Sequence, residues 1–231
     1  YYIPNYLEDV KYCITLGVGN SVDFEIELAK NFLIKSFCFD GTINHLPVEN
    51  ELIKFTKKNV SPSNNFLKQL FKKNKDEFDH IDINSMISAL ISSKEIENIN
   101  QTMLKIDIEG DEYKNIIDIN NEYLKNFKII VVEFHMLHHI IRPNNFDVIN
   151  SCFQKILKNF EIVYIQEVND SIKTYKVKGN ILFTTLEISF LNKSCFLKTE
   201  NRNFIKDLNP LKNKKEIKKT SFYDFYNKNL S

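Results

Sequence analysis

The sequence predicts an α/β domain built on a mostly parallel sheet with helices on both faces. Short apolar runs alternate along the 231-residue chain with segments whose apolar residues recur at helical spacing. The run 128–134 is nearly all β-branched, which is typical of a parallel strand buried on both faces. Polar residues follow the ends of several of these strands, where open parallel sheets bind their ligands.

Each element is justified by its periodicity and its flanking turns. Seven runs are expected as strands, the last of them antiparallel: Tyr12 to Leu16, Ile34 to Phe39, Leu52 to Val60, Met103 to Ile108, Lys128 to Phe134, Phe160 to Ile165 and Ile181 to Leu191. Five helices are expected: Val22 to Leu33 after a cap at Asn20 or Ser21, a lysine-rich stretch around Phe66 to Phe71, Ile81 to Ile91 opened by Asn84 and Ser85, Tyr113 to Tyr123, and Phe146 to Leu157.

Composition excludes several classes of protein. The formal net charge is +1, which disfavours a nucleic-acid partner, and no apolar stretch is long enough to span a membrane. The four cysteines are far apart, without metal-ligand spacing, as expected of reduced thiols in the cytoplasm. We expect one domain over 1–197 and a partly ordered extension over 198–231. Because the chain opens on Tyr1, without an initiator methionine, we expect it to be a piece of a longer polypeptide.

The first strand ends in Gly17-Val18-Gly19, where glycines allow a close approach to a ligand. A dinucleotide site needs a third glycine, and Val22 stands in its place, which favours a different adenosyl ligand. Asp40 ends the second strand and could accept the hydroxyls of a ribose. Its alternative role is local, because Asp-Gly-Thr is a good turn sequence.

Two later strands end in acidic residues. Asp107 and Glu109, one residue apart, would face the same side of an extended strand. Buried carboxylates need a partner, which could be a divalent cation, helix-terminus amides or Lys105. Glu133 and His135 repeat the arrangement on the next strand, and His135 is either a general base or a hydrogen-bonded structural histidine. His138 and His139, nearby, are expected in a solvent-exposed loop.

These runs resemble a known family. Leu104-Lys-Ile-Asp-Ile-Glu-Gly-Asp-Glu-Tyr113 resembles the Lys-x-Asp-x-Glu-Gly-x-Glu signature of FkbM-type methyltransferases, and Ile130 to His135 resembles that family's following strand, which ends in Glu-x-His. The resemblance covers most of residues 10 to 192. It implies a Rossmann-like, seven-stranded class I methyltransferase sheet, S-adenosylmethionine as cofactor, and a sugar or glycan hydroxyl as acceptor, in the synthesis of capsule or another surface polysaccharide.

The resemblance also implies roles for individual residues. Gly17, Val18 and Gly19 would line the methionine end of the cofactor, Asp40 and Thr42 would lie at the ribose, and Asn59 and Ser61 near the adenine. Asp107, Glu133 and His135 would act in catalysis, with Mg²⁺ a possible further cofactor at Asp107, Glu109 and Glu133. An alternative is a degenerate methyltransferase fold that serves as a binding or scaffolding module, fused to or associated with other glycan-biosynthesis enzymes.

Overall fold

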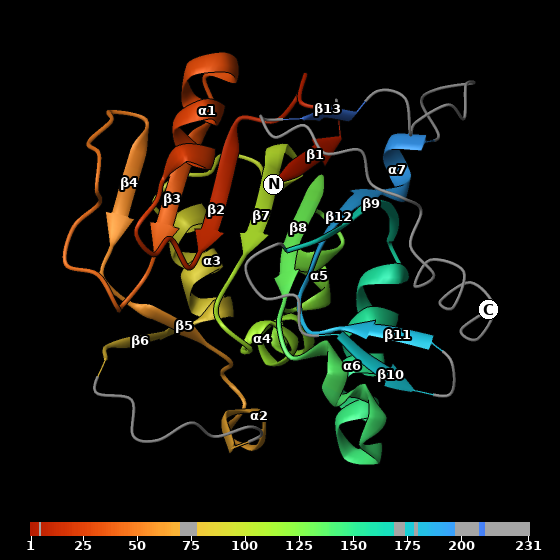
Figure 1. Ribbon diagram of the computed structural model, residues 1–231. Coiled ribbons are helices and arrows are strands. Elements are labelled where there is room, and N and C mark those ends of the chain that lie inside the picture. Colours follow the sequence, from red (N-terminus) through yellow and green to blue (C-terminus); the bar gives the residue numbers. More distant parts are fainter. Residues whose placement is uncertain (5, 70–77, 169–173, 178–179, 197–207, 211–231) are drawn as a thin grey trace.

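A computed structural model describes residues 1–4, 6–69, 78–168, 174–177, 180–196 and 208–210 (Figure 1). Its centre is a seven-stranded sheet in the order β4-β3-β2-β7-β8-β12-β9. All neighbouring strands run parallel except β12, which is antiparallel to both β8 and β9. This order, with one antiparallel strand inserted next to the edge, is that of the Rossmann-like class I methyltransferase sheet, and it confirms the predicted fold class.

The seven strands of the central sheet are β2 (Tyr12–Leu16), β3 (Lys35–Phe39), β4 (Ile53–Thr56), β7 (Thr102–Ile106), β8 (Ile129–Phe134), β9 (Phe160–Glu167) and β12 (Leu186–Asn192). Three small pairs lie outside it: β1 (Tyr2–Pro4) with β13 (Leu208–Pro210), β5 (Asn59–Ser61) with β6 (His80–Asp82), and β10 (Thr174–Val177) with β11 (Asn180–Phe183). The helices are α1 (Asp23–Phe32), α2 (Asn65–Gln69), α3 (Ile83–Ser92), α4 (Glu112–Asp118), α5 (Asn121–Leu124), α6 (Pro143–Leu157) and α7 (Lys193–Phe196), with 3₁₀ turns η1 (Ile99–Gln101) and η2 (Leu137–Ile141).

Strand alternation divides the sheet into two faces with separate cores. One face carries Leu104 and Ile106 of β7 and packs against α3, α4 and α6. The opposite face carries Met103 and packs against Leu28 of α1, the N-terminal segment and α7. Helices therefore cover both faces, as the alternation of strands and helices predicts.

Three predicted elements are each divided in two. The run Leu52 to Val60 forms β4 and β5, because the amide of Lys58 turns back to the carbonyl of Thr56 (2.8 Å) and breaks the extension. The run Ile181 to Leu191 forms β11 and β12, with the carbonyl of Thr184 accepting the amide of Leu137 between them (2.9 Å). The predicted helix Tyr113 to Tyr123 is α4 and α5, and the Asn120 side chain caps the second by accepting the amide of Glu122.

Two helix starts also differ from their predictions. The N-cap position of α1 is Val22, which makes no capping hydrogen bond, but the hydroxyl of Ser21 accepts the amide of Asp23, the first residue of the helix (3.2 Å). Helix α3 begins at Ile83, and the side chain of Asp82 caps it by accepting the amide of Ser85. Of the predicted helix around Phe66 to Phe71, Leu70 and Phe71 lie outside the described residues.

The N-terminal segment lies against the α1 face of the sheet. Ile3 is buried in its core, and β1 pairs antiparallel with β13, a part of the predicted extension. The rest of residues 198–231 lies outside the described residues. All four cysteines are buried as free thiols, as predicted. Within the described residues, no helix is both long and apolar enough to cross a membrane.

Candidate functional site at the carboxyl ends of β2, β7 and β8

The glycine turn after β2 lies directly against the end of β7. From β2 the chain passes to β3 and β4 on one side of the sheet, and β7 lies on the other side, so the strand order reverses between β2 and β7. Such a reversal opens the crevice in which doubly wound sheets bind ligands. Gly17 has φ +79° and leaves no space for a side chain, since an added Cβ would lie 1.7 Å from the carbonyl oxygen of Asp107. Gly19 also has a positive φ (+57°), but it faces open space.

Asp40 is bound to the glycine turn. One carboxylate oxygen accepts the amides of Val18 (3.0 Å) and Gly19 (2.9 Å), and the other accepts the amide and the hydroxyl of Thr42. Burial alone would raise the pKa of Asp40, but these hydrogen bonds hold it below its usual value. Asp40 thus stabilises the turn, and its predicted contact with a ribose stays a prediction.

The residues predicted to lie near the adenine are on β5, beside this turn. Asn59 accepts the amide of Gly41 with its side-chain oxygen (2.8 Å), and Ser61 is half-buried at the end of the strand. The structure therefore brings Asn59 next to the Asp40 turn, on the same side of the sheet as the glycines. Their contact with an adenine stays a prediction.

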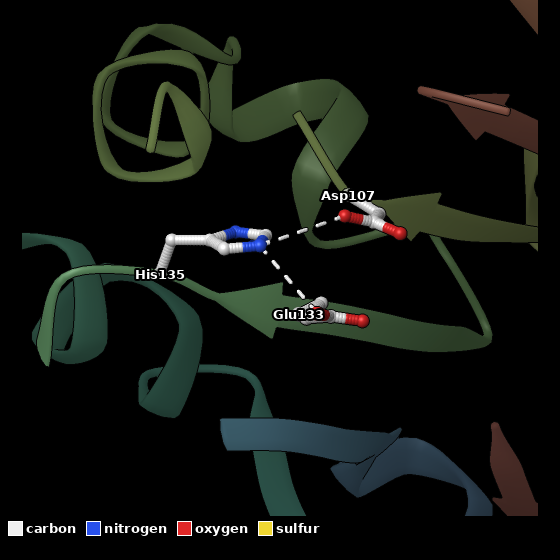
Figure 2. A group of neighbouring side chains, drawn as sticks. All are labelled: Asp107, Glu133 and His135. Atoms are coloured by element: carbon white, nitrogen blue, oxygen red, sulfur yellow. Dashed lines mark ion pairs between the residues drawn. The ribbon is translucent and has the colours of Figure 1, made fainter. Parts of the chain in front are cut away.

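Asp107, Glu133 and His135 form one cluster at the ends of β7 and β8 (Figure 2). One ligand atom from each lies within 4.8 Å of the others. The Nε2 of His135 is 3.4 Å from Glu133 Oε1 and 3.9 Å from Asp107 Oδ1. Carboxylate and imidazole groups at these separations could share a divalent cation or a proton.

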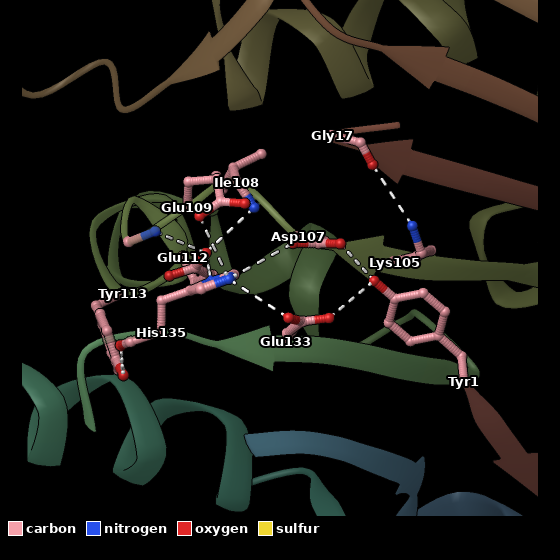
Figure 3. Close-up of polar contacts among 11 residues, drawn as sticks. Tyr1, Gly17, Lys105, Asp107, Ile108, Glu109, Glu112, Tyr113, Glu133 and His135 are labelled. Atoms are coloured by element: carbon pink, nitrogen blue, oxygen red, sulfur yellow. Dashed lines mark hydrogen bonds and ion pairs between the residues drawn. The ribbon is translucent and has the colours of Figure 1, made fainter. Parts of the chain in front are cut away.

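Glu112 orients the imidazole from behind (Figure 3). It is fully buried at the start of α4, and its Oε1 lies 2.9 Å from His135 Nδ1 while accepting the amides of Ile108 (3.1 Å) and Gly110 (2.9 Å). With Nδ1 bound to Glu112, Nε2 is directed at Asp107 and Glu133. A carboxylate behind a histidine in this way fixes its tautomer and orientation.

The charges in the cluster differ from residue to residue. Burial lowers the pKa of His135, but the hydrogen bonds to Glu112 and Glu133 and the charges of nearby carboxylates outweigh it and raise the pKa to about 10. Burial raises the pKa of Asp107, against the opposing charge of Lys105. Burial also acts to raise the pKa of Glu133, yet His135 holds it below its usual value. At neutral pH His135 is therefore a cation, and Asp107 is the stronger base of the two carboxylates.

Glu109 does not reach the cluster along a strand. Strand β7 ends at Ile106, and the chain turns through Glu109, which has φ +57°, so the argument from strand alternation is wrong for this residue. The Glu109 side chain is 79% exposed, although its Oε2 lies 3.6 Å from His135 Nε2. Glu109 is outside the group of three whose ligand atoms converge, and its role as a metal ligand stays a prediction.

Lys105 faces the α1 side of the sheet, opposite to Leu104 and Ile106. Its ammonium lies 3.5 Å from the carbonyl oxygen of Gly17 and 3.9 Å from Glu25, a buried carboxylate of α1 that also accepts the hydroxyl of Thr15. An open pocket of about 810 Å³ lies between α1 and this lysine, and it is bordered by Val18, Ser21, Phe24, Glu25, Lys105 and Asp107 among others. The volume suits a drug-sized ligand.

Two residues of the site, Glu112 and Tyr1, were not predicted from the sequence. Glu112 belongs to the acidic run that begins at Asp107, and that run was the signal available for it. Tyr1 is far from the site in sequence, yet its hydroxyl reaches Asp107 and Glu133.

His138 and His139, expected in an exposed loop, are half-buried in η2, and His138 stacks on Tyr175 of β10 with ring centroids 4.6 Å apart.

Comparisons with known proteins add little to this picture. No protein-family model and no curated protein matches the chain. Among solved structures, the chain is similar to one described as a "putative methyltransferase" from Thermoplasma acidophilum, with 10% sequence identity and a TM-score of 0.33. The match covers 79% of this chain and 67% of that one. The fold assignment rests on the strand order itself.

Proposed function

We propose that this chain is an S-adenosylmethionine-dependent methyltransferase that acts on a hydroxyl oxygen. The observation that carries the proposal is the meeting of the glycine turn with a carboxylate–imidazole cluster at the reversal of strand order. Glycines that permit close approach suit an adenosyl ligand, and the cluster beside them suits removal of a proton from an acceptor. No other group of polar side chains in the described residues combines these two features.

The residues present fit the cofactor. The pocket beside Val18, Lys105 and Asp107 is large enough, and Lys105 and Glu25 offer opposite charges for the carboxylate and ammonium of a methionine moiety. When bound there, S-adenosylmethionine would supply an activated methyl group. The protein's own contribution is to orient the two reactants and to exclude water around Asp107 and Glu133.

The cluster supports proton removal by a carboxylate. A hydroxyl acceptor loses its proton as its oxygen takes the methyl group, so a base must lie within hydrogen-bonding distance. Asp107, with its raised pKa, is the residue we propose for this step. His135 is protonated at neutral pH, and we propose that it holds Glu133 in place and offsets negative charge. His135 could act as the general base, the role predicted from the sequence, only as the neutral imidazole, and its raised pKa disfavours that form at neutral pH.

A divalent cation is an alternative to the proton on His135, because a histidine that ligates a metal must be neutral. Asp107, Glu133 and His135 are the residues that would hold it, with Glu112 orienting the histidine from behind. Two carboxylates suit Mg²⁺, while an imidazole ligand also suits Mn²⁺, Fe²⁺ or Zn²⁺. Such an ion would lower the pKa of a bound hydroxyl. Full activity after exhaustive chelation would remove the metal from the scheme.

For the acceptor we propose a sugar hydroxyl, in capsule or other surface-polysaccharide synthesis. This rests on the resemblance of the runs around Asp107 and Glu133 to FkbM-type methyltransferases. The second candidate is a binding or scaffolding module without catalysis. The observation that favours it is Asp40, whose carboxylate is already occupied by Val18, Gly19 and Thr42.

Titration calorimetry with S-adenosylmethionine separates the two candidates. The enzyme should bind the cofactor with micromolar affinity, on the order of −8 kcal/mol. Asp107→Asn should keep most of that affinity and lose transfer of a radiolabelled methyl group to oligosaccharide acceptors. Glu122→Gln, at an exposed side chain of α5, is the matched control and should leave both unchanged. Absence of cofactor binding by the folded protein would refute the enzyme and leave the module.

A further inference from the structure

The side chain of Tyr1 lies within the carboxylate cluster. Its hydroxyl is 2.5 Å from Asp107 Oδ2 and 3.3 Å from Glu133 Oε2, and Figure 3 shows it directed between the two. Both neighbouring atoms are carboxylate oxygens, which accept hydrogen bonds, so the Tyr1 hydroxyl is the donor. A neutral hydroxyl is thus already bound at the carboxylates that the proposed chemistry requires.

The Tyr1 ring is held by two groups of different chemistry. The ammonium of Lys105 lies 4.4 Å from the ring centroid, and the ring of Phe24 meets it edge to face at 5.3 Å. Both contacts suit a flat or ring-shaped group. We call the space enclosed by Phe24, Lys105, Asp107 and Glu133 the ring slot.

We propose that the ring slot is the acceptor subsite, that it binds a six-membered ring bearing a hydroxyl, and that Tyr1 occupies it until the acceptor enters. This inference rests on the proposed function. The acceptor oxygen must lie beside its base, and the Tyr1 hydroxyl holds that position. The acceptor and the Tyr1 side chain therefore exclude one another.

The structure allows Tyr1 to leave without unfolding the segment that carries it. Strand β1 is anchored from Tyr2 onward, where the amide of Tyr2 binds Glu187 (2.8 Å), Ser189 donates to the Tyr2 carbonyl, and Ile3 is buried. Rotation about the side-chain bonds of Tyr1 would open the slot while β1 keeps these contacts. Tyr1 also borders the pocket beside α1, so an opened slot would adjoin the space proposed for the cofactor.

The proposed reaction at the ring slot is a methyl transfer coupled to a proton transfer. The acceptor oxygen forms a bond to the methyl carbon as the bond from that carbon to sulfur breaks, leaving the neutral thioether. The hydroxyl proton passes to Asp107, which lies at hydrogen-bonding distance from the oxygen position. Glu133 borders the same position, and the ammonium of Lys105 lies over the ring beside it.

Truncation of Tyr1 should turn the ring slot into a binding site for small ring alcohols. The probes are phenol, cyclohexanol as a saturated ring with a hydroxyl, and toluene as a ring without one. We would measure their binding to the full chain, without cofactor, by calorimetry and ligand-observed NMR. Tyr1→Ala should bind phenol or cyclohexanol at least about tenfold more tightly than the unmodified protein, because the ring of the probe can take the place of the Tyr1 ring against Phe24 and Lys105. Toluene should bind more weakly than phenol, since it cannot reach Asp107 and Glu133.

Two variants serve as controls. Tyr1→Phe keeps the ring in the slot and should bind no probe. Tyr175→Ala removes the same side chain from exposed β10 and should also gain nothing. Failure of Tyr1→Ala to bind either alcohol while its circular dichroism and melting temperature match the unmodified protein would overturn the proposal. Equal binding of toluene and phenol would also overturn it.

The probes bind without cofactor, so this test of the ring slot can succeed or fail separately from a test of the proposed function. Binding of phenol without any affinity for S-adenosylmethionine would leave a ring-alcohol site and refute the methyltransferase. Cofactor binding without probe binding would keep the methyltransferase and refute the subsite. Phenol bound far better than cyclohexanol would assign an aromatic acceptor, and comparable binding would be compatible with a pyranose.

Discussion

Replacement of Glu112 tests the electrostatics of the cluster most directly. Its Oε1 accepts from the amides of Ile108 and Gly110 and faces His135 Nδ1, all at 2.9 to 3.1 Å, in a position with no exposed surface. Each hydrogen bond to a charged group contributes about 1.5–3 kcal/mol. Because such contributions are not additive, we expect Glu112→Ala to lower the free energy of unfolding by about 4 kcal/mol.

Glu112→Gln separates charge from shape. The amide oxygen of the glutamine can still accept the hydrogen bonds made to Oε1. The new NH₂ group takes the place of Oε2, which has no hydrogen-bond partner, so it becomes a buried donor without an acceptor. We expect a loss of about 2 kcal/mol by denaturant unfolding. In the metal-free protein the pKa of His135 should also fall from about 10 by at least about one unit, because the carboxylate that raises this pKa most is replaced by a neutral amide. NMR titration of the imidazole carbon-bound protons measures this.

Glu122 on α5 provides the control. Its carboxylate is 72% exposed and pairs with Lys125, which is 43% exposed, so Glu122→Gln removes an acidic charge at the surface with little expected effect on either measurement. A Glu112→Gln protein whose His135 pKa is unchanged would refute the reasoning, because the raised pKa would then arise elsewhere in the cluster.

The remaining predictions concern the glycine turn, the base and pH. Gly17→Ala should cost at least about 3 kcal/mol in the free energy of unfolding, because its Cβ would overlap the Asp107 carbonyl, whereas Gly19→Ala, in open space, should cost about 1 kcal/mol; denaturant melts compare them. Asp107→Asn should lower the rate of methyl transfer by about 100-fold or more at nearly unchanged cofactor affinity in calorimetry. The His135 pKa is raised in the folded protein, so its stabilisation is complete below pH 6.5 and is lost as pH rises toward about 10. Melting curves of His135→Gln should lack this loss, and a parallel decline in both proteins would contradict it.

The sheet was predictable where the residues themselves carry the pattern. Strands β2 and β8 lie at or within one residue of their predicted bounds, since each is a continuous apolar run that ends in polar residues. The division of β4 from β5 was not predictable. The turn between Thr56 and Lys58 contains neither glycine nor proline, so the sequence carries no signal for it.

The site was predictable in location but not in its pairings. Residues at the ends of parallel strands must meet at one edge, which places Asp107, Glu133 and His135 together. The pairing of His135 with Glu112 depends on how α4 packs against the end of β8, and the contact of Tyr1 depends on the path of the N-terminal segment across the sheet. Both are tertiary contacts, and hydrophobic periodicity along the sequence gives no information about them.

The close contact between Gly17 and the backbone of Asp107 gives the site a mechanical property. Since the two turns touch without room for a methyl group, and the Asp107 amide also binds the Leu16 carbonyl (2.8 Å), they can move only as one body. A ligand that shifts the glycine turn must therefore shift the Asp107 backbone with it. A ligand bound in the pocket beside α1 would therefore displace the Asp107 backbone directly, with no side chain between them. This favours an ordered sequence of binding in which that pocket fills before the acceptor site.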